Sequence, residues 1–304
     1  EILNQLGAKI EYIGKFGYPP IQIKKSKQIN HKVKIKGNTS SQYLTSLILS
    51  SSILTKNQDL EIEIIGSLIS KPYINITLKL MKLFGLEIKE KNNNTYLIPS
   101  NQTLISPKEF TIEGDASSAS YFLAAAAISG KLLKVNGVGS SSIQGDVKFA
   151  EVLKKMGADV TINHNSIEIS SNNKLKSFNE DLNHIPDAAM TAAIVALYAD
   201  GVSILKNIGS WRVKETDRIK AMANELKKIG AKITEGDDYL KIEPPLKFNN
   251  ASIDTYDDHR MAMCFSLVSL NSLNKKGAFL KINDPDCVSK TFPDYFDYFK
   301  KISY

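Results

Sequence analysis

The sequence repeats itself with a period of about 72 residues, and this period constrains the possible folds more than any other feature. An apolar residue, a glycine, an Ala or Leu, a charged residue and an Ile or Val follow one another four times, with the glycines 78, 72 and 73 residues apart. Each of the last three glycines follows a helical spacing of apolar residues and precedes a predicted strand. We therefore expect them to end helices in the left-handed conformation. The four glycines are Gly7, Gly85, Gly157 and Gly230.

Two further series keep the same period. Asp115, Asp187 and Asp258 each precede a run of small or apolar residues and are predicted to open helices, and residues 38–42 open the equivalent helix of the first repeat. A short motif of an aliphatic residue, Gly and Ser is predicted to follow the next strand in three repeats, at residues 65–67, 138–140 and 208–210. The predicted unit is strand, helix, strand, helix, strand, strand. Because the period is too long for a thin solenoid, we expect a few units grouped into globular domains.

Composition limits the class of protein. With 304 residues, 42% of them hydrophobic, the chain can bury one or two cores, and no apolar run approaches the roughly 18–20 residues of a membrane span. The two cysteines, Cys264 and Cys287, are too few for a disulfide framework and lack metal-ligand spacing, so a reduced, cytoplasmic protein without a metal is expected. The first residues show no signal peptide and open in mid-pattern, which predicts a chain cut at its N-terminus.

The net charge of +7 has two readings. Nucleic-acid binding favours clustered Lys and Arg with interleaved aromatic residues. In this chain the lysines are spread over the whole length, which is typical of a solvated surface with a compositional bias. A modest positive field would also suit small polyanionic substrates.

Polar residues gather at the predicted helix starts, where free N–H groups and the helix dipole favour anions. Ser40, Ser41 and Gln42 are three consecutive hydrogen-bonding side chains suited to phosphate or hydroxyl oxygens, although plain N-capping explains them equally well. Ser70 and Tyr73 flank a Pro and have the same alternative.

Charged residues at three other helix starts are harder to explain structurally. If residues 214–218 are helical, Lys214 and Arg218 share one face, and an anion between them would relieve their repulsion. Arg260, close to a helix N-terminus, is unfavourable for the dipole unless a carboxylate or phosphate lies there. Asp187 leads into an apolar helix and is either an N-cap or a partly desolvated carboxylate with a shifted pKa.

Five motifs together resemble bacterial 5-enolpyruvylshikimate-3-phosphate (EPSP) synthases: residues 114–121, 184–190, 212–218, 258–263 and 290–296. The resemblance implies an α/β, two-domain enolpyruvyl transferase fold of the inside-out α/β barrel type, built from βαβαββ units, with the active site between the domains. Residues 1–112 would be the remaining, incomplete part of the N-terminal domain and 113–304 a nearly complete C-terminal domain. Because family ligands precede this chain, it is expected to have little activity by itself.

The resemblance also implies a reaction, transfer of the carboxyvinyl group of phosphoenolpyruvate to shikimate 3-phosphate by a monomer, with no organic cofactor and no metal. Asp187 would hydrogen-bond the attacking hydroxyl and Glu215 would protonate the enolpyruvyl methylene. Ser210 stands where many relatives have Asn. Shikimate 3-phosphate would contact Ser40, Ser41, Gln42, Ser70, Tyr73, Asp187, Ser210 and Lys214, and phosphoenolpyruvate would contact Gln42, Arg218, Arg260 and Lys290.

Two other functions stay open at this point. The related transferase that acts on UDP-N-acetylglucosamine shares the fold but uses a cysteine in a catalytic loop, whereas Cys264 lies in an apolar helical run and Cys287 just before Lys290. A nucleic-acid-binding module built on the basic charge is the non-enzyme alternative. Activity that survives removal of both cysteines would favour an EPSP synthase over the first. Salt-sensitive retention on a polyphosphate column, without response to shikimate 3-phosphate, would favour the second.

Overall fold

The computed structural model describes residues 1–24, 29–92 and 94–303, and the chain divides into two compact units, Glu1–Thr111 and Ile112–Tyr304. Each unit has its own cluster of buried apolar residues. None of the helices formed by the described residues is long and apolar enough to cross a membrane.

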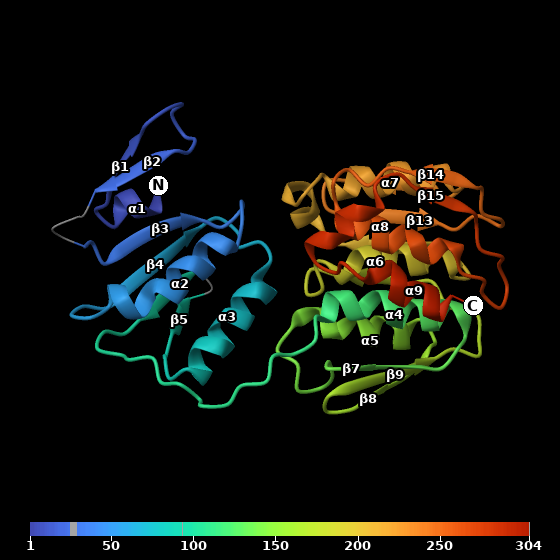
Figure 1. The fold of residues 1–304 in the computed structure, drawn as a ribbon, viewed down its shortest axis with the longest axis horizontal. Helices are drawn as coiled ribbons and strands as arrows, with labels where there is room; N and C mark the ends of the chain where they lie inside the picture. The colour runs from blue at the N-terminus through green and yellow to red at the C-terminus, as the bar shows by residue number, and fades with distance from the viewer. Residues whose placement is uncertain (25–28, 93, 304) are drawn as a thin grey trace. The chain divides into compact units, whose positions relative to one another are not determined.

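The first unit contains a four-stranded sheet in the order β3-β4-β6-β5, in which β3 and β4 are parallel and the other pairs antiparallel. The helices α2 and α3 pack against each other (Figure 1). A separate antiparallel pair is formed by β1 and β2. The elements are α1 (Ile2–Gln5), β1 (Lys9–Tyr12), β2 (Ile21–Lys24), β3 (Lys32–Lys36), α2 (Gln42–Leu54), β4 (Leu60–Ile65), α3 (Lys71–Leu83), β5 (Lys89–Asn92) and β6 (Thr95–Ile98).

The second unit repeats this arrangement in two sheets. One sheet has the strand order β10-β11-β13-β12, with β10 and β11 parallel and the other pairs antiparallel. The other sheet, β7-β9-β8, matches the last three strands of that order. The last pair, β14 and β15, is parallel. The elements are α4 (Ala116–Ser129), β7 (Leu133–Asn136), α5 (Phe149–Lys155), β8 (Asp159–Ile162), β9 (Ser166–Ser170), β10 (Asn179–Asp181), α6 (Ala188–Val195), β11 (Ser203–Lys206), α7 (Arg218–Lys228), β12 (Lys232–Glu235), β13 (Leu240–Glu243), β14 (Ala251–Ile253), α8 (His259–Ser266), β15 (Leu280–Ile282) and α9 (Tyr295–Ile302), with short 3₁₀ helices η1 (Gly145–Lys148), η2 (Ala196–Tyr198), η3 (Gly209–Val213), η4 (Leu267–Ser269) and η5 (Pro285–Lys290).

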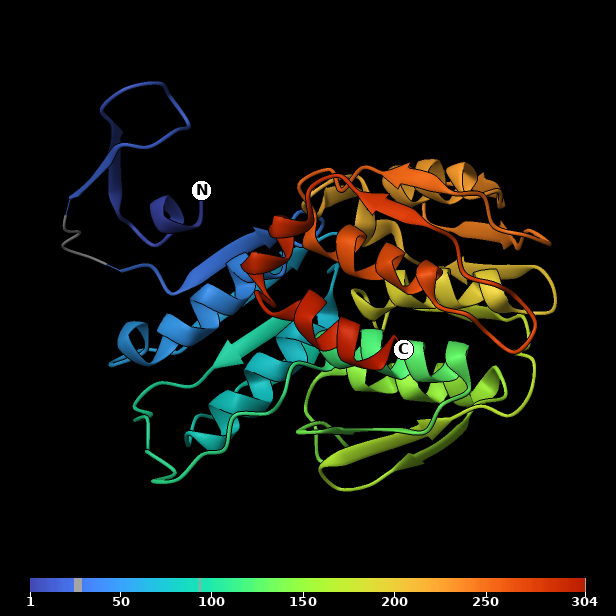
Figure 2. The ribbon, with the colours of Figure 1, turned by 45° about the vertical axis from the view of Figure 1, so that its right-hand side comes forward.

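Three helices form the centre of the second unit. In Figures 1 and 2, α4, α6 and α8 lie side by side, and α6 contacts both of the others. Every residue of α6 and of α8 is buried. The many Ala side chains of α4 and α6 let these two helices approach closely, and Ser120 and Thr191 join them through hydroxyls 2.8 Å apart. Helices without a polar face are typical of the buried centre of a domain.

The predicted repeat is confirmed in detail. The glycines Gly7, Gly85, Gly157 and Gly230 have φ of 101°, 82°, 97° and 100°, and a strand begins two to four residues after each. Residues 32–98 and 179–243 contain the full predicted order of strands and helices. The last repeat departs from it: η5 and α9 follow β15, and no further strands follow them among the described residues.

Candidate active site

The parallel strand pairs place the helix starts of each repeat at one edge of a sheet. In a parallel pair the carboxyl ends meet at the same edge, and side chains that follow them come together there. In the first unit, Gly37 and Ile69 follow β3 and β4 and are joined by a hydrogen bond from Ile69 N to Gly37 O. A side chain at Gly37 would lie 2.7 Å from Ser67 O, so only glycine permits this close approach.

The predicted residues of the first unit all lie at this edge. Ser41 is the buried N-cap of α2, Ser40 Oγ accepts a hydrogen bond from Gln42 N at 3.2 Å, and Gln42 is exposed. Ser70 is the buried N-cap of α3 with a left-handed φ of 55°, and Tyr73 N donates to Ser70 O. Neither Ser41 nor Ser70 uses its side chain to cap its helix, so plain N-capping does not explain these serines.

The equivalent edge of the second unit is centred on Asp187. Asp187 is the N-cap of α6 but makes no side-chain capping bond; instead Oδ1 accepts from Arg218 Nη1 at 2.8 Å and Oδ2 from Arg260 Nη2 at 2.9 Å. Asp187 is only 8% exposed, so the prediction of a partly desolvated carboxylate is confirmed. Trp211 Nε1 donates to Pro186 O at 2.7 Å and holds η3 against the start of α6.

Arg218 binds three carboxylates from three elements. Besides Asp187, its guanidinium donates through Nη2 to Glu215 Oε2 at 2.7 Å, and through Nε and Nη2 to Asp258 at 2.7 and 3.2 Å. Its side chain is 1% exposed. Burial acts to lower the Arg218 pKa, but Asp187 and Asp258 outweigh it and raise the pKa above its usual value.

The helix predicted at residues 214–218 is absent. Lys214 has an extended backbone after η3, and α7 begins only at Arg218, capped by Asp217. Asp217 accepts from Lys220 N and also holds Arg212, so the loop is fixed at its end. The predicted anion between the two cations does exist in the protein itself: Asp187 Oδ1 lies 3.8 Å from Lys214 Nζ and 2.8 Å from Arg218 Nη1.

Glu215 lies on the more exposed side of this cluster. Its Oε1 accepts from Lys290 Nζ at 2.7 Å, and its side chain is 26% exposed. Burial raises the pKa of Glu215, but Arg218 and Lys290 together outweigh burial and lower it to about 2. Glu215 is therefore ionised at neutral pH in this structure.

Asp258 and its neighbours complete the cluster from α8. Asp258 is fully buried and caps α8 by accepting from Arg260 N at 3.0 Å, while Arg260 Nη1 donates to Tyr121 OH on α4 at 3.2 Å. The unfavourable position of Arg260 near a helix start is therefore offset by Asp187 and the capping carboxylate. Burial and Arg260 lower the pKa of His259 to about 4, which keeps its imidazole neutral.

Three polar residues of this cluster were missed as site residues. Asp258 carried a signal, its position at a charged helix start, but its bonds to Arg218 could not be predicted from spacing. Tyr121 ends the motif at residues 114–121, which was not interpreted as a binding segment, and Asp146 carried no signal. Asp146 is buried in η1, accepts a hydrogen bond from Ser117 Oγ, and has no partner for Oδ1 among the described residues. Burial and the charge of Asp187 raise its pKa to about 7.

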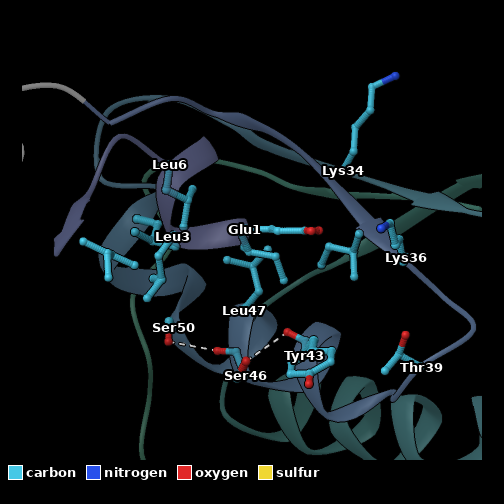
Figure 3. Close-up of a pocket in the computed structure, with 14 residues that line it drawn as sticks. Glu1, Leu3, Leu6, Lys34, Lys36, Thr39, Tyr43, Ser46, Leu47 and Ser50 are labelled. Carbon is cyan, nitrogen blue, oxygen red and sulfur yellow. Dashed lines mark hydrogen bonds between the residues drawn. The ribbon is translucent and has the colours of Figure 1, made fainter. Parts of the chain in front are cut away.

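A cavity of about 840 Å³ in the first unit does not coincide with these residues. Apolar side chains such as Leu3, Leu6 and Leu47 form much of its wall, while the polar residues labelled in Figure 3 do not converge on one point. Its lining includes Thr39 and Tyr43, which flank residues 40–42 in sequence, but none of the predicted site residues. Among the described residues, no group of three or more His, Cys, Asp or Glu could hold a metal ion.

Comparison with known proteins identifies the family. The model of the EPSP synthase (3-phosphoshikimate 1-carboxyvinyltransferase) family matches residues 1–299. The chain belongs to the EPSP synthase family. The 3-phosphoshikimate 1-carboxyvinyltransferases of Janthinobacterium sp. (strain Marseille) and Aliivibrio fischeri (strain MJ11) are 55% and 50% identical to it, over 100% and 99% of this chain and 69% of each relative.

Solved structures agree with this family and with the predicted fold. EPSP synthase from Acinetobacter baumannii matches with a TM-score of 0.76 at 25% identity, over 99% of this chain and 69% of that chain. The enolpyruvyl transferase NikO from Streptomyces tendae matches with a TM-score of 0.72 at 13% identity, which shows a shared fold alone. The enolpyruvyl transferase fold that the resemblance implied is confirmed.

Proposed function

We propose that this member of the EPSP synthase family transfers the enolpyruvyl group of phosphoenolpyruvate to the 5-hydroxyl of shikimate 3-phosphate, giving 5-enolpyruvylshikimate 3-phosphate and phosphate. The family description and the relatives at 50–55% identity name this carboxyvinyl transfer. It is a step of the shikimate pathway to chorismate and the aromatic amino acids.

One structural relationship supports the proposed roles: Asp187 and Glu215 bind different nitrogens of the same guanidinium, Arg218 Nη1 and Nη2. The reaction needs two proton transfers at neighbouring atoms. The 5-hydroxyl loses its proton as its oxygen bonds to C2 of phosphoenolpyruvate, and C3 gains one; phosphate then leaves as C3 gives a proton back. Two carboxylates in unlike environments can divide these transfers.

Asp187 is the better placed acceptor for the hydroxyl proton. It is nearly buried, and its two carboxylate oxygens lie against the positive charges of Arg218, Arg260 and Lys214. Shikimate 3-phosphate would lie against Asp187 and Lys214, with Ser210 in the same segment. Ser40, Ser41, Gln42, Ser70 and Tyr73 would bind it from the first unit, where helix N-termini favour its phosphate.

Glu215 is proposed as the proton donor to C3, and its pKa of about 2 sets a condition on that role. A carboxyl group ionised so strongly is a poor acid until the positive charge beside it is neutralised. Lys290, Arg218 and Arg260 are proposed to bind the carboxylate and phosphate of phosphoenolpyruvate, with Gln42. An anion on Lys290 and on Arg218 Nη2 would raise the pKa of Glu215 only when the substrate is bound.

The alternative acceptor, UDP-N-acetylglucosamine, is less well supported. A cysteine nucleophile or acid works best with a lowered pKa. Burial raises the pKa of Cys264 to about 12 and that of Cys287 to about 11, so neither thiol is prepared for catalysis.

The test is phosphate release with phosphoenolpyruvate and shikimate 3-phosphate by this chain joined to the N-terminal segment of one of its relatives, because little activity is expected of the chain by itself. It is followed for Asp187→Asn and Glu215→Gln in that enzyme. Each variant should lose turnover by about 10²–10⁴-fold, because a positioned acid or base contributes that much. The matched controls Asp297→Asn and Glu243→Gln change exposed surface pairs and should keep turnover. Release that requires UDP-N-acetylglucosamine instead, or near-normal turnover of both active-site variants, would refute the proposal.

A further inference from the structure

The backbone just before Asp258 is strained. Tyr256 and Asp257 both have φ of 56°, in the left-handed region that side chains other than Gly rarely adopt. Each such residue costs of the order of 1–2 kcal/mol, and such strain persists only where neighbouring contacts enforce it. The turn ends at Asp258, whose carboxylate holds both Arg218 and the first turn of α8. The conformation of the turn therefore decides where the site carboxylate and guanidinium meet.

A buried carboxylate on α7 grips this turn. The side chain of Glu225 is fully buried, and its Oε1 accepts from Tyr256 OH at 2.7 Å while Oε2 accepts from Asp254 N at 3.1 Å. Lys228 Nζ balances its charge at 2.7 Å and also bonds Asp254 Oδ2 at 2.8 Å. Of the two hydrogen-bonded groups, one belongs to Asp254, just before the strained turn, and the other to Tyr256, the first strained residue.

Glu225 and Arg218 act from the same helix. Seven residues apart, they lie two turns apart on one face of α7. Arg218 holds the segment at Asp258 and Glu225 holds it at Asp254 and Tyr256. The two attachments to one helix therefore hold the turn on both sides, at Asp254 and Tyr256 before Asp257 and at Asp258 after it.

We propose that Glu225 is a positioning residue for the transfer reaction: through Tyr256 it holds the left-handed turn that sets Asp258, and with it Arg218 and Arg260, in register. This proposal rests on the proposed function, because Arg218 and Arg260 are the groups expected to bind phosphoenolpyruvate. A purely structural buried carboxylate would stabilise the fold without affecting how the substrate is bound.

The sharpest variant is Tyr256→Phe, which deletes one hydroxyl from a partly exposed side chain. It should raise the KM for phosphoenolpyruvate about fivefold, since a hydrogen bond to a charged group is lost and the cations shift, while the KM for shikimate 3-phosphate changes less. Tyr239→Phe is the matched control: Tyr239 is 37% exposed against 39% for Tyr256, and its hydroxyl makes no hydrogen bond in the described residues.

Rescue separates positioning from plain stability. If Glu225 works by holding the turn against its strain, adding Asp257→Gly to Tyr256→Phe should bring the KM for phosphoenolpyruvate most of the way back to that of the unsubstituted enzyme, because glycine adopts a positive φ freely. A Tyr256→Phe enzyme with a lower Tm but unchanged kinetics would overturn the proposal, as would a Tyr256→Phe, Asp257→Gly double variant no better than Tyr256→Phe. Arg260→Lys serves as the reference: if it too leaves the KM for phosphoenolpyruvate unchanged, the proposed function itself is at fault.

Discussion

Arg218 and Asp258 form a buried ion pair in which Nε lies 2.7 Å from Oδ2 and Nη2 lies 3.2 Å from Oδ1. The two side chains are 1% and 0% exposed. Removing such charges from water costs several kcal/mol per ion, and the pair offsets this only while both partners remain. Because Asp258 also caps α8, the pair joins the first turns of two helices that carry site residues.

Asp258→Asn should therefore destabilise the protein strongly while keeping the shape of the side chain. Breaking a buried pair typically costs about 3–5 kcal/mol, and the remaining bonds of Arg218 to Asp187 and Glu215 place the expected loss near the lower end, about 3 kcal/mol. Urea unfolding should report it. Asp297→Asn, which breaks an exposed pair with Lys300, should change the free energy of unfolding by less than about 1 kcal/mol. Equal effects of the two variants would contradict the importance of burial.

The sequence predicted the repeat, the helix starts and the fold because these depend on local chemistry. A glycine that must adopt a positive φ, or an Asp that caps a helix, is decided within a few residues of chain. The helices that begin at Ala116, Ala188 and His259 start where the Asp series placed them. The motif at residues 290–296 proved partly structural: Phe292 and Tyr295 pack on Phe122.

What the sequence could not predict were contacts between residues far apart in the chain. Lys214 and Arg218 were expected to share a helix face because their spacing allowed it, but η3 and the cap at Asp217 keep Lys214 out of the helix. Their charges meet on Asp187 instead, which lies 27 and 31 residues away in sequence. Asp146 also escaped notice, because an Asp in a short turn is ordinarily exposed and only the packing of α4 and η1 buries it.

Asp146 should make stability fall as the pH rises towards neutrality. Its pKa is raised to about 7 by burial and by Asp187, against a usual value of 3.8, so between these values the folded protein binds a proton that the unfolded chain has lost. The free energy of unfolding then decreases with pH over that window, by at most about 1.4 kcal/mol per pH unit from this group.

Asp146→Asn removes this titration and should flatten the fall in stability between pH 4 and pH 7. The measurement is urea unfolding at a series of pH values, with the exposed Asp159→Asn as a control that keeps the slope of the unsubstituted protein. A slope unchanged by Asp146→Asn would mean that Asp146 is ionised in the folded protein, with solvent or a cation at Oδ1.

Lys290 should control the acidity of Glu215. Burial alone would raise the Glu215 pKa, and the value of about 2 depends on Arg218 and on the Lys290 ammonium 2.7 Å from Oε1. Lys290→Met removes that charge and hydrogen bond with little change in length, so the Glu215 pKa should rise. Because a depressed carboxyl pKa stabilises the fold above the unfolded value of 4.5 and this gain is lost as pH falls towards 2, the variant should also lose less stability on acidification across that window.

The direct measurement is titration of the Glu215 side-chain carboxyl by carbon NMR, with Lys300→Met as a control for general charge, since Lys300 pairs with Asp297 on an exposed surface. Addition of phosphoenolpyruvate to the unsubstituted enzyme should move the same pKa upward if, as we propose, the substrate anion binds Lys290 and offsets its charge. A Glu215 pKa unaffected by both Lys290→Met and phosphoenolpyruvate would leave the carboxylate without a means of gaining its proton, and Glu215 would have to be replaced as the donor to C3.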